Sequence, residues 1–205
     1  MRTSLLLFIL LIANSLCFGQ TVKIGKQVWG THNLDLTRFR NGDLITQAKS
    51  NEEWFRAHIN KQPAWCYVNN DSTTNGRYGK LYNWYAVNDP RGLAPTGWHI
   101  PTDAEWTALV NTLDGESEAG HVLKASSGWY ENGNGSRSNG FSAMPGGFRH
   151  NEGAFFHIGQ LGFWWSASTH DVTLAWYRTL YHDSPYMTRF DGFQGDGLSV
   201  RCLKD

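Results

Sequence analysis

Glycines and aromatic residues alternate through the second half of the chain, and this pattern restricts the fold more than any other feature. Glycines recur from Gly128 to Gly162, and short aromatic pieces such as Trp129–Tyr130 and Phe163–Trp165 lie between them. Each glycine destabilises a helix interior by roughly 1 kcal/mol relative to alanine. The segment therefore predicts long loops alternating with short strands. A chain with 10 tryptophans and only 18% charged residues also has enough aromatic volume to fill the irregular space between such loops.

The clearest helix start lies in the first half, after a short extended segment over 98–100 that Pro101 ends. Thr102 predicts an N-cap, and Glu105, three residues later, completes a capping box. Asp114 and Gly115 predict the end of this helix. Its apolar face comprises Trp106, Leu109, Val110 and Leu113, which recur at helical spacing.

Weaker patterns predict the remaining elements. A second capping box, Ser50 with Glu53, starts a helix with Trp54, Phe55, His58 and Ile59 at helical spacing. Further helices are expected over 80–87 and 118–124, and a polar loop over 69–76. Strands are expected in a hairpin over 22–29 and over 65–68, 175–181, 186–190 and 198–203. Early helices followed by late strands indicate an α+β fold, and the even composition indicates one domain over residues 20–205.

The first 19 residues have the pattern of a secretory signal peptide. Arg2 gives a positive start, Leu5 to Ile12 is apolar, and Cys17-Phe18-Gly19 places small residues before a cleavage site. The apolar run is too short to span a bilayer, and no later stretch is long enough. Lipidation at Cys17 is an alternative, although Leu16 is not the small residue that such sites prefer. We therefore expect an exported protein that is secreted, periplasmic or associated with the cell surface.

Two cysteines, Cys66 and Cys202, remain beyond that segment. An oxidising compartment predicts a long-range disulfide between them, and the alternative is two buried free thiols. The formal net charge of +0 and the absence of a basic run disfavour nucleic-acid binding.

Five ordered blocks of sequence resemble one known family. They are Ile24–Trp29, Tyr78–Ala86, Ala94–Trp106, Gly140–Arg149 and Leu198–Cys202. Together they resemble the Fibrobacter succinogenes major paralogous domain, a family without an established activity. That family is similar to the formylglycine-generating-enzyme superfamily. The resemblance implies a C-type-lectin-like fold with two main helices, a twisted antiparallel sheet and long ordered loops that bind ligands. A disulfide between Cys66 and the final strand would suit this fold.

The residues that enzymes of that superfamily need are missing. Their copper chemistry uses a closely spaced cysteine pair, whereas Cys66 and Cys202 are far apart in the sequence. Ser168, His170 and Asp171 are sequence neighbours, but adjacency does not make a catalytic relay, and the chain has no G-x-S-x-G elbow. We therefore expect no catalytic residues and no cofactor.

Metal binding has little support in the sequence. Asp71 to Gly76 resembles the start of a calcium loop, but Tyr82 occupies the twelfth position, where an EF-hand needs Glu. A structural calcium bound by loop oxygens stays open as an alternative. His99 has no second ligand at metal-binding spacing, so we expect it to be packed or hydrogen-bonded.

Aromatic and polar residues in the loop-rich region predict a ligand-binding surface. Sugars present apolar C–H faces on which aromatic rings stack, and amide and charged groups bind their hydroxyls. The candidate contact residues are Trp129, Tyr130, Asn132, Arg137, His150 and Asn151. The sequence thus indicates a secreted, non-catalytic recognition domain whose loop face binds a glycan or a protein. The alternatives are an uncharacterised enzyme on the same scaffold and a structural or adhesion protein at the cell surface.

Overall fold

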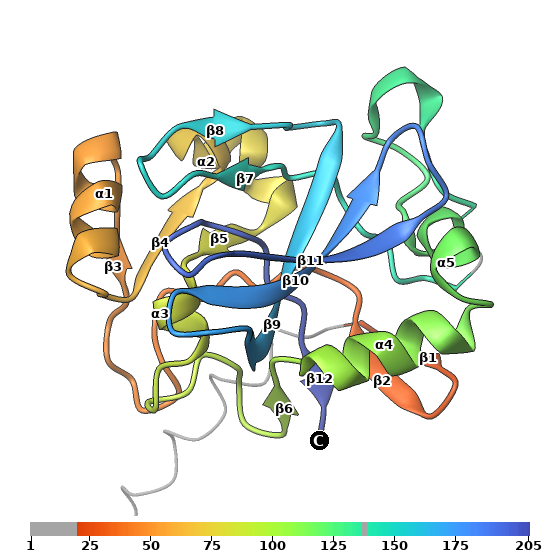
Figure 1. Ribbon diagram of the computed structural model, residues 1–205, viewed down its shortest axis with the longest axis horizontal. Coiled ribbons are helices and arrows are strands. Elements are labelled where there is room, and N and C mark those ends of the chain that lie inside the picture. The colour runs from red at the N-terminus through yellow and green to blue at the C-terminus, as the bar shows by residue number, and fades with distance from the viewer. Residues whose placement is uncertain (1–19, 137–138) are drawn as a thin grey trace, which may run out of the picture.

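The computed structural model describes residues 20–136 and 139–205 and has an α+β architecture (Figure 1). The predicted signal peptide, residues 1–19, and the candidate contact Arg137 lie outside the described residues. The helices are α1 (Asn51–Ile59), α2 (Ser72–Asn75), α3 (Trp84–Val87), α4 (Asp103–Thr112) and α5 (Glu116–Leu123), with 3-10 turns η1 (Val68–Asn70), η2 (Gly76–Tyr78) and η3 (Tyr130–Asn132). No helix of the described part is long and apolar enough to cross a membrane.

The strands form small, mostly antiparallel sheets. One sheet has the order β1 (Thr21–Ile24), β2 (Gln27–Gly30), β12 (Leu203–Lys204), β6 (Trp98–His99), and a second has β11 (Met187–Phe193), β10 (Leu174–Tyr181), β9 (Leu161–Thr169). A third has β3 (Thr46–Gln47), β4 (Ala64–Tyr67), β5 (Lys80–Tyr82), and β7 (Phe148–Arg149) pairs with β8 (Phe155–Phe156). The predicted hairpin and the strands at β4, β10 and β11 are confirmed.

Helix α4 confirms the capping box predicted at Thr102 and Glu105. The Thr102 hydroxyl accepts a hydrogen bond from the Glu105 N–H at 3.2 Å, and the Glu105 carboxylate accepts one from the Thr102 N–H at 2.8 Å. The predicted apolar residues Trp106, Leu109 and Val110 are buried. His99 lies beside this helix start, and its ring nitrogens are 2.8 Å from Asp205 and 3.0 Å from Glu105, so the expectation of a hydrogen-bonded histidine is confirmed.

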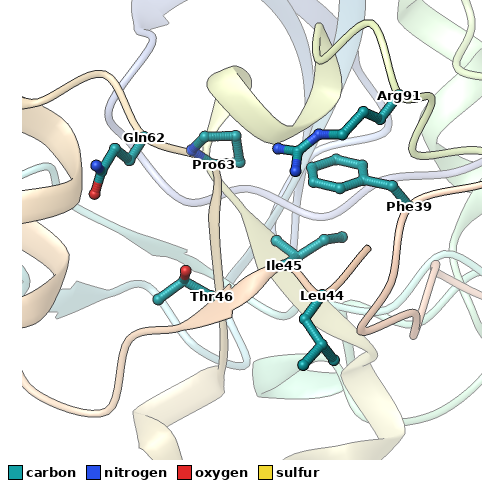
Figure 2. A pocket seen from close by; sticks show the side chains of 7 residues that line it. All are labelled: Phe39, Leu44, Ile45, Thr46, Gln62, Pro63 and Arg91. Carbon is teal, nitrogen blue, oxygen red and sulfur yellow. The ribbon is translucent and has the colours of Figure 1, made fainter. Parts of the chain in front are cut away.

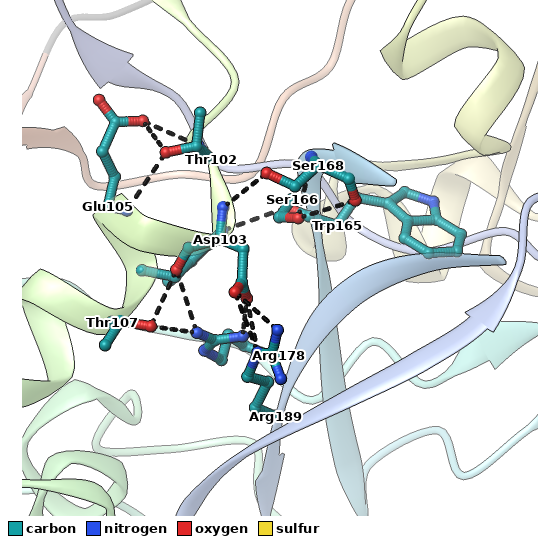
Figure 3. A network of polar contacts seen from close by, with 10 residues as sticks. Thr102, Asp103, Glu105, Thr107, Trp165, Ser166, Ser168, Arg178 and Arg189 are labelled. Carbon is teal, nitrogen blue, oxygen red and sulfur yellow. Dashed lines mark hydrogen bonds and ion pairs between the residues drawn. The ribbon is translucent and has the colours of Figure 1, made fainter. Parts of the chain in front are cut away.

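The N-terminal end of α4 is fixed to the second sheet through Asp103, which the sequence did not single out (Figure 3). Its carboxylate accepts hydrogen bonds from Arg178 of β10 at 2.7 Å and from Arg189 of β11 at 3.0 Å. Arg178 also donates to the Thr107 hydroxyl at 2.8 Å. Burial opposes ionisation of Asp103, but the two guanidinium groups outweigh it and lower the pKa of the carboxyl group. One carboxylate thereby bridges two arginines that face each other across β10 and β11 and offsets part of their mutual repulsion.

One expectation about the first half was wrong, and a second, the helix that starts at Ser50, is confirmed as α1. Residues 80–87 do not form one helix: β5 pairs with β4, and Asn83 then caps α3 by accepting from the Ala86 N–H at 3.1 Å. In α1 the buried residues are Trp54 and Ala57, whereas Phe55 and Ile59 are exposed. Pairing of β5 with β4 overrode the helical spacing over 80–87. In α1, only one edge of the helix meets the core.

Two loop and strand boundaries also differ from expectation. The stretch over 69–76 contains α2 and parts of two 3-10 turns rather than an open loop. The expected strand over 198–203 is reduced to single bridges from Leu198 to Tyr82 and from Ser199 to Trp164, followed by β12. This segment therefore changes partners along its length, from β5 to β9 and then to β2 and β6.

Tryptophan indoles connect the core to the backbone of the loops. Their N–H groups donate to carbonyl oxygens far away in the sequence, so each ring fills space and also satisfies a buried backbone group. The pairs are Trp54 with Gly195, Trp65 with Ile45, Trp84 with Ser166, Trp106 with Trp165, Trp129 with Ala143 and Trp165 with Tyr82.

The predicted disulfide is wrong, because Cys66 and Cys202 are both free and buried. They belong to separate hydrophobic clusters: Cys66 packs with Trp54 and Tyr78, and Cys202 packs with Val200. Burial raises the pKa of the Cys66 thiol to about 12, although the Arg149 charge opposes the shift. Both cysteines act as small apolar residues here.

We expect Thr102→Ala to lower the free energy of unfolding by about 1 kcal/mol, because the substitution leaves the Glu105 N–H without its cap. Urea denaturation measures the effect. Thr102→Ser retains the hydroxyl group and is the matched control, expected to stay close to wild type. Equal stability of the alanine variant and wild type would contradict the role of the cap.

We expect both Cys66 and Cys202 to resist alkylation in the native protein, because neither thiol is accessible and the Cys66 thiolate is disfavoured. Both should react fully in guanidinium chloride without a reducing agent. Peptide mapping by mass spectrometry identifies the labelled positions. A Cys66–Cys202 linked peptide from the unreduced protein would show that the disulfide exists after all.

Candidate functional site

A mostly buried carboxylate marks the loop that follows β11. Asp196 is 9% exposed, and its Oδ1 accepts a hydrogen bond from the Asn151 N–H at 2.9 Å. Burial raises the pKa of Asp196 to about 6, and the Asn151 N–H and the nearby His150 only partly oppose that effect. Carboxyl groups that titrate near neutrality are concentrated at functional sites, so this residue is the first candidate.

Two histidines adjoin this loop. The Nδ1 atom of His58, on α1, is buried and has no hydrogen-bond partner among the described residues. Gly195 packs so closely against the His58 ring that a Cβ atom has no room there. Burial lowers the pKa of His58, and the charge of His150 lowers it further. His58 and the partly exposed His150 therefore both lie close to the loop that carries Asp196.

A row of five aromatic rings runs beside Asp196, and we call it the aromatic strip. Its members, in order of contact, are Phe156, Phe148, Phe163, Tyr177 and Phe190. Successive ring centroids are 5.6, 5.1, 5.8 and 6.2 Å apart. Phe156 and Phe190, at the two ends, are each 45% exposed. Phe163, in the middle, is 8% exposed and belongs to the core, so the row presents large exposed rings only at its two ends. Large exposed rings are a frequent sign of a binding surface.

The strip and the carboxylate meet at Gly192. A Cβ atom at this position would lie 2.9 Å from the Tyr177 ring and 3.6 Å from Asp196 Oδ2, so both groups cover the same bare stretch of backbone. Burial raises the pKa of Tyr177 to about 12, and the charge of Asp196 contributes. At the other end, the His150 ring lies 6.3 Å from the Phe156 ring. The site is therefore an aromatic row bordered by Asp196, Asn151 and His150.

The structure divides the residues that the sequence predicted as ligand contacts. His150 is partly exposed and borders the aromatic strip, whereas Asn151, contrary to expectation, is 8% exposed and contributes its N–H to Asp196. Tyr130 is exposed and packs on His182, in the turn between β10 and β11, at 5.4 Å between ring centroids, and Asn132 is exposed in the same 3-10 turn.

Trp129 does not present its ring to a ligand, contrary to expectation. It is 5% exposed, its indole donates to the Ala143 carbonyl at 3.0 Å, and the Lys124 ammonium lies 5.4 Å from the ring. The polar run that follows it in sequence, Glu131 to Ser136, suggested an exposed loop. The tryptophan instead belongs to the core beneath that loop.

A hollow lies between β3 and the segment that follows α1 (Figure 2). It has a volume of about 240 Å³ and is lined by Phe39, Leu44, Ile45, Thr46, Gln62, Pro63 and Arg91. The Arg91 guanidinium already pairs with Asp89 at 2.8 Å and Asp43 at 3.3 Å, and it covers the Phe39 ring at 4.1 Å. Because its charge is neutralised internally, this hollow offers little to bind a ligand strongly.

Other candidates from the sequence have structural roles. Asp171 accepts from the N–H groups of Thr173 and Leu174 in a turn, and the Ser168 hydroxyl accepts from the Asp103 N–H. His170 packs on Trp176 with ring centroids 4.5 Å apart. Among the residues that the structure describes, no three His, Cys, Asp or Glu side chains converge as metal ligands would.

Neither Asp196 nor the aromatic strip was predicted from the sequence. The signal that could have pointed to the strip is the alternation along β10 and β11, where Tyr177 and Phe190 are paired opposite each other on one face. Phe148, Phe156 and Phe163 join the row only through the tertiary arrangement of β7, β8 and β9.

We expect the contribution of Asp196 to stability to decline as the pH rises from about 4 to about 6. The folded state holds the Asp196 proton more tightly than the unfolded state. The stabilisation that this proton gives is therefore greatest below the pKa of Asp196 in the unfolded chain, and it declines until the pH reaches the pKa in the folded protein. The total loss is roughly 3 kcal/mol for a shift of about two units. Urea denaturation at pH 4, 5, 6 and 7 should show Asp196→Asn gaining that amount relative to wild type.

Asp183→Asn is the matched control, since Asp183 is exposed in the turn between β10 and β11. The stability of this variant should change with pH in parallel with wild type. A wild-type curve that runs parallel to that of Asp196→Asn would contradict the raised pKa.

Comparison with known proteins agrees with the resemblance seen in the sequence. No curated protein and no solved structure matches the chain. The Fibrobacter succinogenes major domain matches residues 22–204, which includes almost every described residue, the aromatic strip and Asp196. The chain therefore belongs to the Fibrobacter succinogenes major domain family.

Proposed function

We propose that this protein is an exported, non-catalytic recognition domain that binds a glycan along the aromatic strip. The observation that carries the proposal is the exposure of Phe156 and Phe190 at the two ends of this row, with polar groups at its border. The electron-rich face of an aromatic ring attracts the C–H groups of a sugar ring, so each exposed end of the strip can stack on one sugar unit. The signal-peptide pattern over residues 1–19 supports export.

Polar groups at the border of the aromatic strip can form the directional hydrogen bonds that ring stacking does not provide. His150 offers its ring nitrogens beside Phe156, and Asp196 offers a carboxylate oxygen beside Tyr177. Hydroxyl groups of a sugar would bind to these groups and fix its orientation, because directional hydrogen bonds determine specificity in such sites. Tyr130 and Asn132, which pack near His182, would form a separate contact at most.

The C-type-lectin-like fold is part of the same proposal. Two helices of nine and ten residues, α1 and α4, antiparallel pairing in most of the sheets, and long ordered loops support it. The parallel pair of β3 with β4 is a local departure from an all-antiparallel arrangement.

An enzyme on this scaffold is the second candidate, and Asp196 is the observation that favours it. A carboxyl group with a pKa of about 6 can exchange a proton near neutral pH. A hydrolytic activity towards the bound glycan that Asp196→Asn abolishes, without loss of binding, would favour the enzyme over the binding domain.

We expect Phe156→Ala and Phe190→Ala each to weaken glycan binding roughly three- to tenfold, the loss that corresponds to one aromatic contact. A glycan array with the purified protein identifies the ligand, and isothermal titration calorimetry measures the affinities. Phe193→Ala is the matched control, because Phe193 lies on the same strand, is 50% exposed and faces the other side of the sheet.

Two results would contradict the proposal. One is the absence of any glycan ligand for the wild-type protein on the array. The other is an affinity for the identified glycan that Phe156→Ala and Phe190→Ala both leave unchanged.

A further inference from the structure

The outer strand of the second sheet has an unpaired edge. β11 is the end strand in the order β11-β10-β9, and no further strand of the described chain pairs with it. Exposed strand edges are templates for pairing with another chain, and natural proteins protect them with charged side chains, especially lysine, with proline or with a covering segment. β11 contains neither lysine nor proline, and it carries the exposed rings of Phe190 and Phe193.

The hydrogen-bond pattern identifies which backbone groups point outward. The Gln194 N–H donates to the Thr173 carbonyl at 2.9 Å, which makes that pair a hydrogen-bonded one. Hydrogen-bonded and non-hydrogen-bonded pairs alternate along an antiparallel ladder. By the observed register, the N–H and C=O groups of Arg189 and Asp191 therefore point away from β10. The Phe193 carbonyl is already occupied by the Asp196 N–H at 2.8 Å, so the free edge ends there.

The sequence of this edge is complementary to itself. When two copies of β11 pair in antiparallel orientation about a two-fold axis at Phe190, Arg189 of each copy lies opposite Asp191 of the other. Opposite charges directly across an antiparallel pair are favourable, and like charges are unfavourable. The two Phe190 rings then form a non-hydrogen-bonded pair, in which side chains approach most closely. Arg189 and Asp191 form the two hydrogen-bonded pairs on either side.

The charged side chains are already held in place for this arrangement. Arg189 is fixed by Asp103, with 2.9 Å between the ions, and its guanidinium carbon lies 3.3 Å from the centroid of the Trp176 ring. Asp191 lies 3.4 Å from the His170 ring nitrogen. Because both side chains are ordered on one face of the sheet, little further side-chain entropy is lost when a second strand docks.

We infer that β11 is a dimerisation edge, and that two copies of this chain pair through it antiparallel about Phe190 to form one continuous six-stranded sheet. A two-fold interface of this kind uses the same surface on both copies. It would also bring the Phe190 ends of the two aromatic strips together. The inference concerns self-association and does not depend on any glycan being bound.

Analytical ultracentrifugation of the purified protein over a range of concentrations tests the inference. We expect a reversible monomer–dimer equilibrium for wild type. Asp191→Arg places arginine opposite Arg189 in both pairs and should shift the protein to monomer, with at least a tenfold weaker association. Asp183→Arg makes the same change of charge on the exposed turn and should leave the equilibrium unchanged.

A charge exchange makes the test specific to the register. Arg189→Asp alone places Asp opposite Asp191 and should also be monomeric. An equimolar mixture of Asp191→Arg with Arg189→Asp restores opposite charges in both pairs, so the mixture should form a heterodimer. Thermal melts confirm that each variant is folded. The new carboxylate of Arg189→Asp faces Asp103, and this variant can fail to fold. In that event Asp191→Pro is the second variant expected to be monomeric. Proline at this position removes only an N–H that points away from β10.

Hydrogen exchange gives an independent measurement. The amides of Arg189 and Asp191 should exchange more slowly as the protein concentration rises, and the amide of Phe190, which already binds within the sheet, should not change. A wild-type protein that stays monomeric up to its solubility limit would overturn the inference. So would a dimer that persists unchanged in both Asp191→Arg and Asp191→Pro.

Discussion

Buried arginines hold together a chain that has little regular structure. Arg201 is completely buried and donates to the carbonyl oxygens of Gly30 and Phe141 and to the side chain of Asn33. Burial lowers the pKa of Arg201 to about 9, which measures how strongly the surroundings disfavour its charge. The buried guanidinium group is tolerated because its N–H groups donate to backbone carbonyls. Loops leave such carbonyls without a partner in a helix or sheet. One side chain thus connects β2, the segment before β7 and the final residues.

Arg149 has the same role around the candidate site. Its guanidinium group donates to the carbonyls of Gly153, Ala48 and Ser50, and it packs over the Trp54 ring at 4.8 Å. The first of these bonds closes the turn that carries His150 and Asn151, and the others fix the start of α1, which carries His58. Trp54 then donates to Gly195, next to Asp196. The site is therefore assembled from three separate segments whose relative positions depend on one buried cation and one indole.

The elements that could be predicted are those determined by neighbouring residues. The Thr102 capping box and the β1–β2 hairpin depend on signals within a few positions, and both were found. The helix expected over 80–87 failed because its helical spacing competed with strand pairing between Cys66 and Leu81, which no local pattern reveals. Burial of Trp129 was missed for a similar reason, since its partner Ala143 lies fourteen residues away beneath the loop. The environment of Asp196 depends on contacts with Asn151 and Tyr177 and is entirely tertiary.

The position of β12 has a consequence for how the chain folds. Leu203 pairs with Trp29 on one side and with His99 on the other, so a C-terminal segment completes the sheet that the N-terminal hairpin begins. Arg201 and Gly30, which are bonded, are separated by 171 positions. Contacts of such long range require closure of a large loop before they stabilise anything, and they slow folding. The β1–β2 hairpin must therefore wait, with one edge unpaired, until nearly the whole chain has become compact.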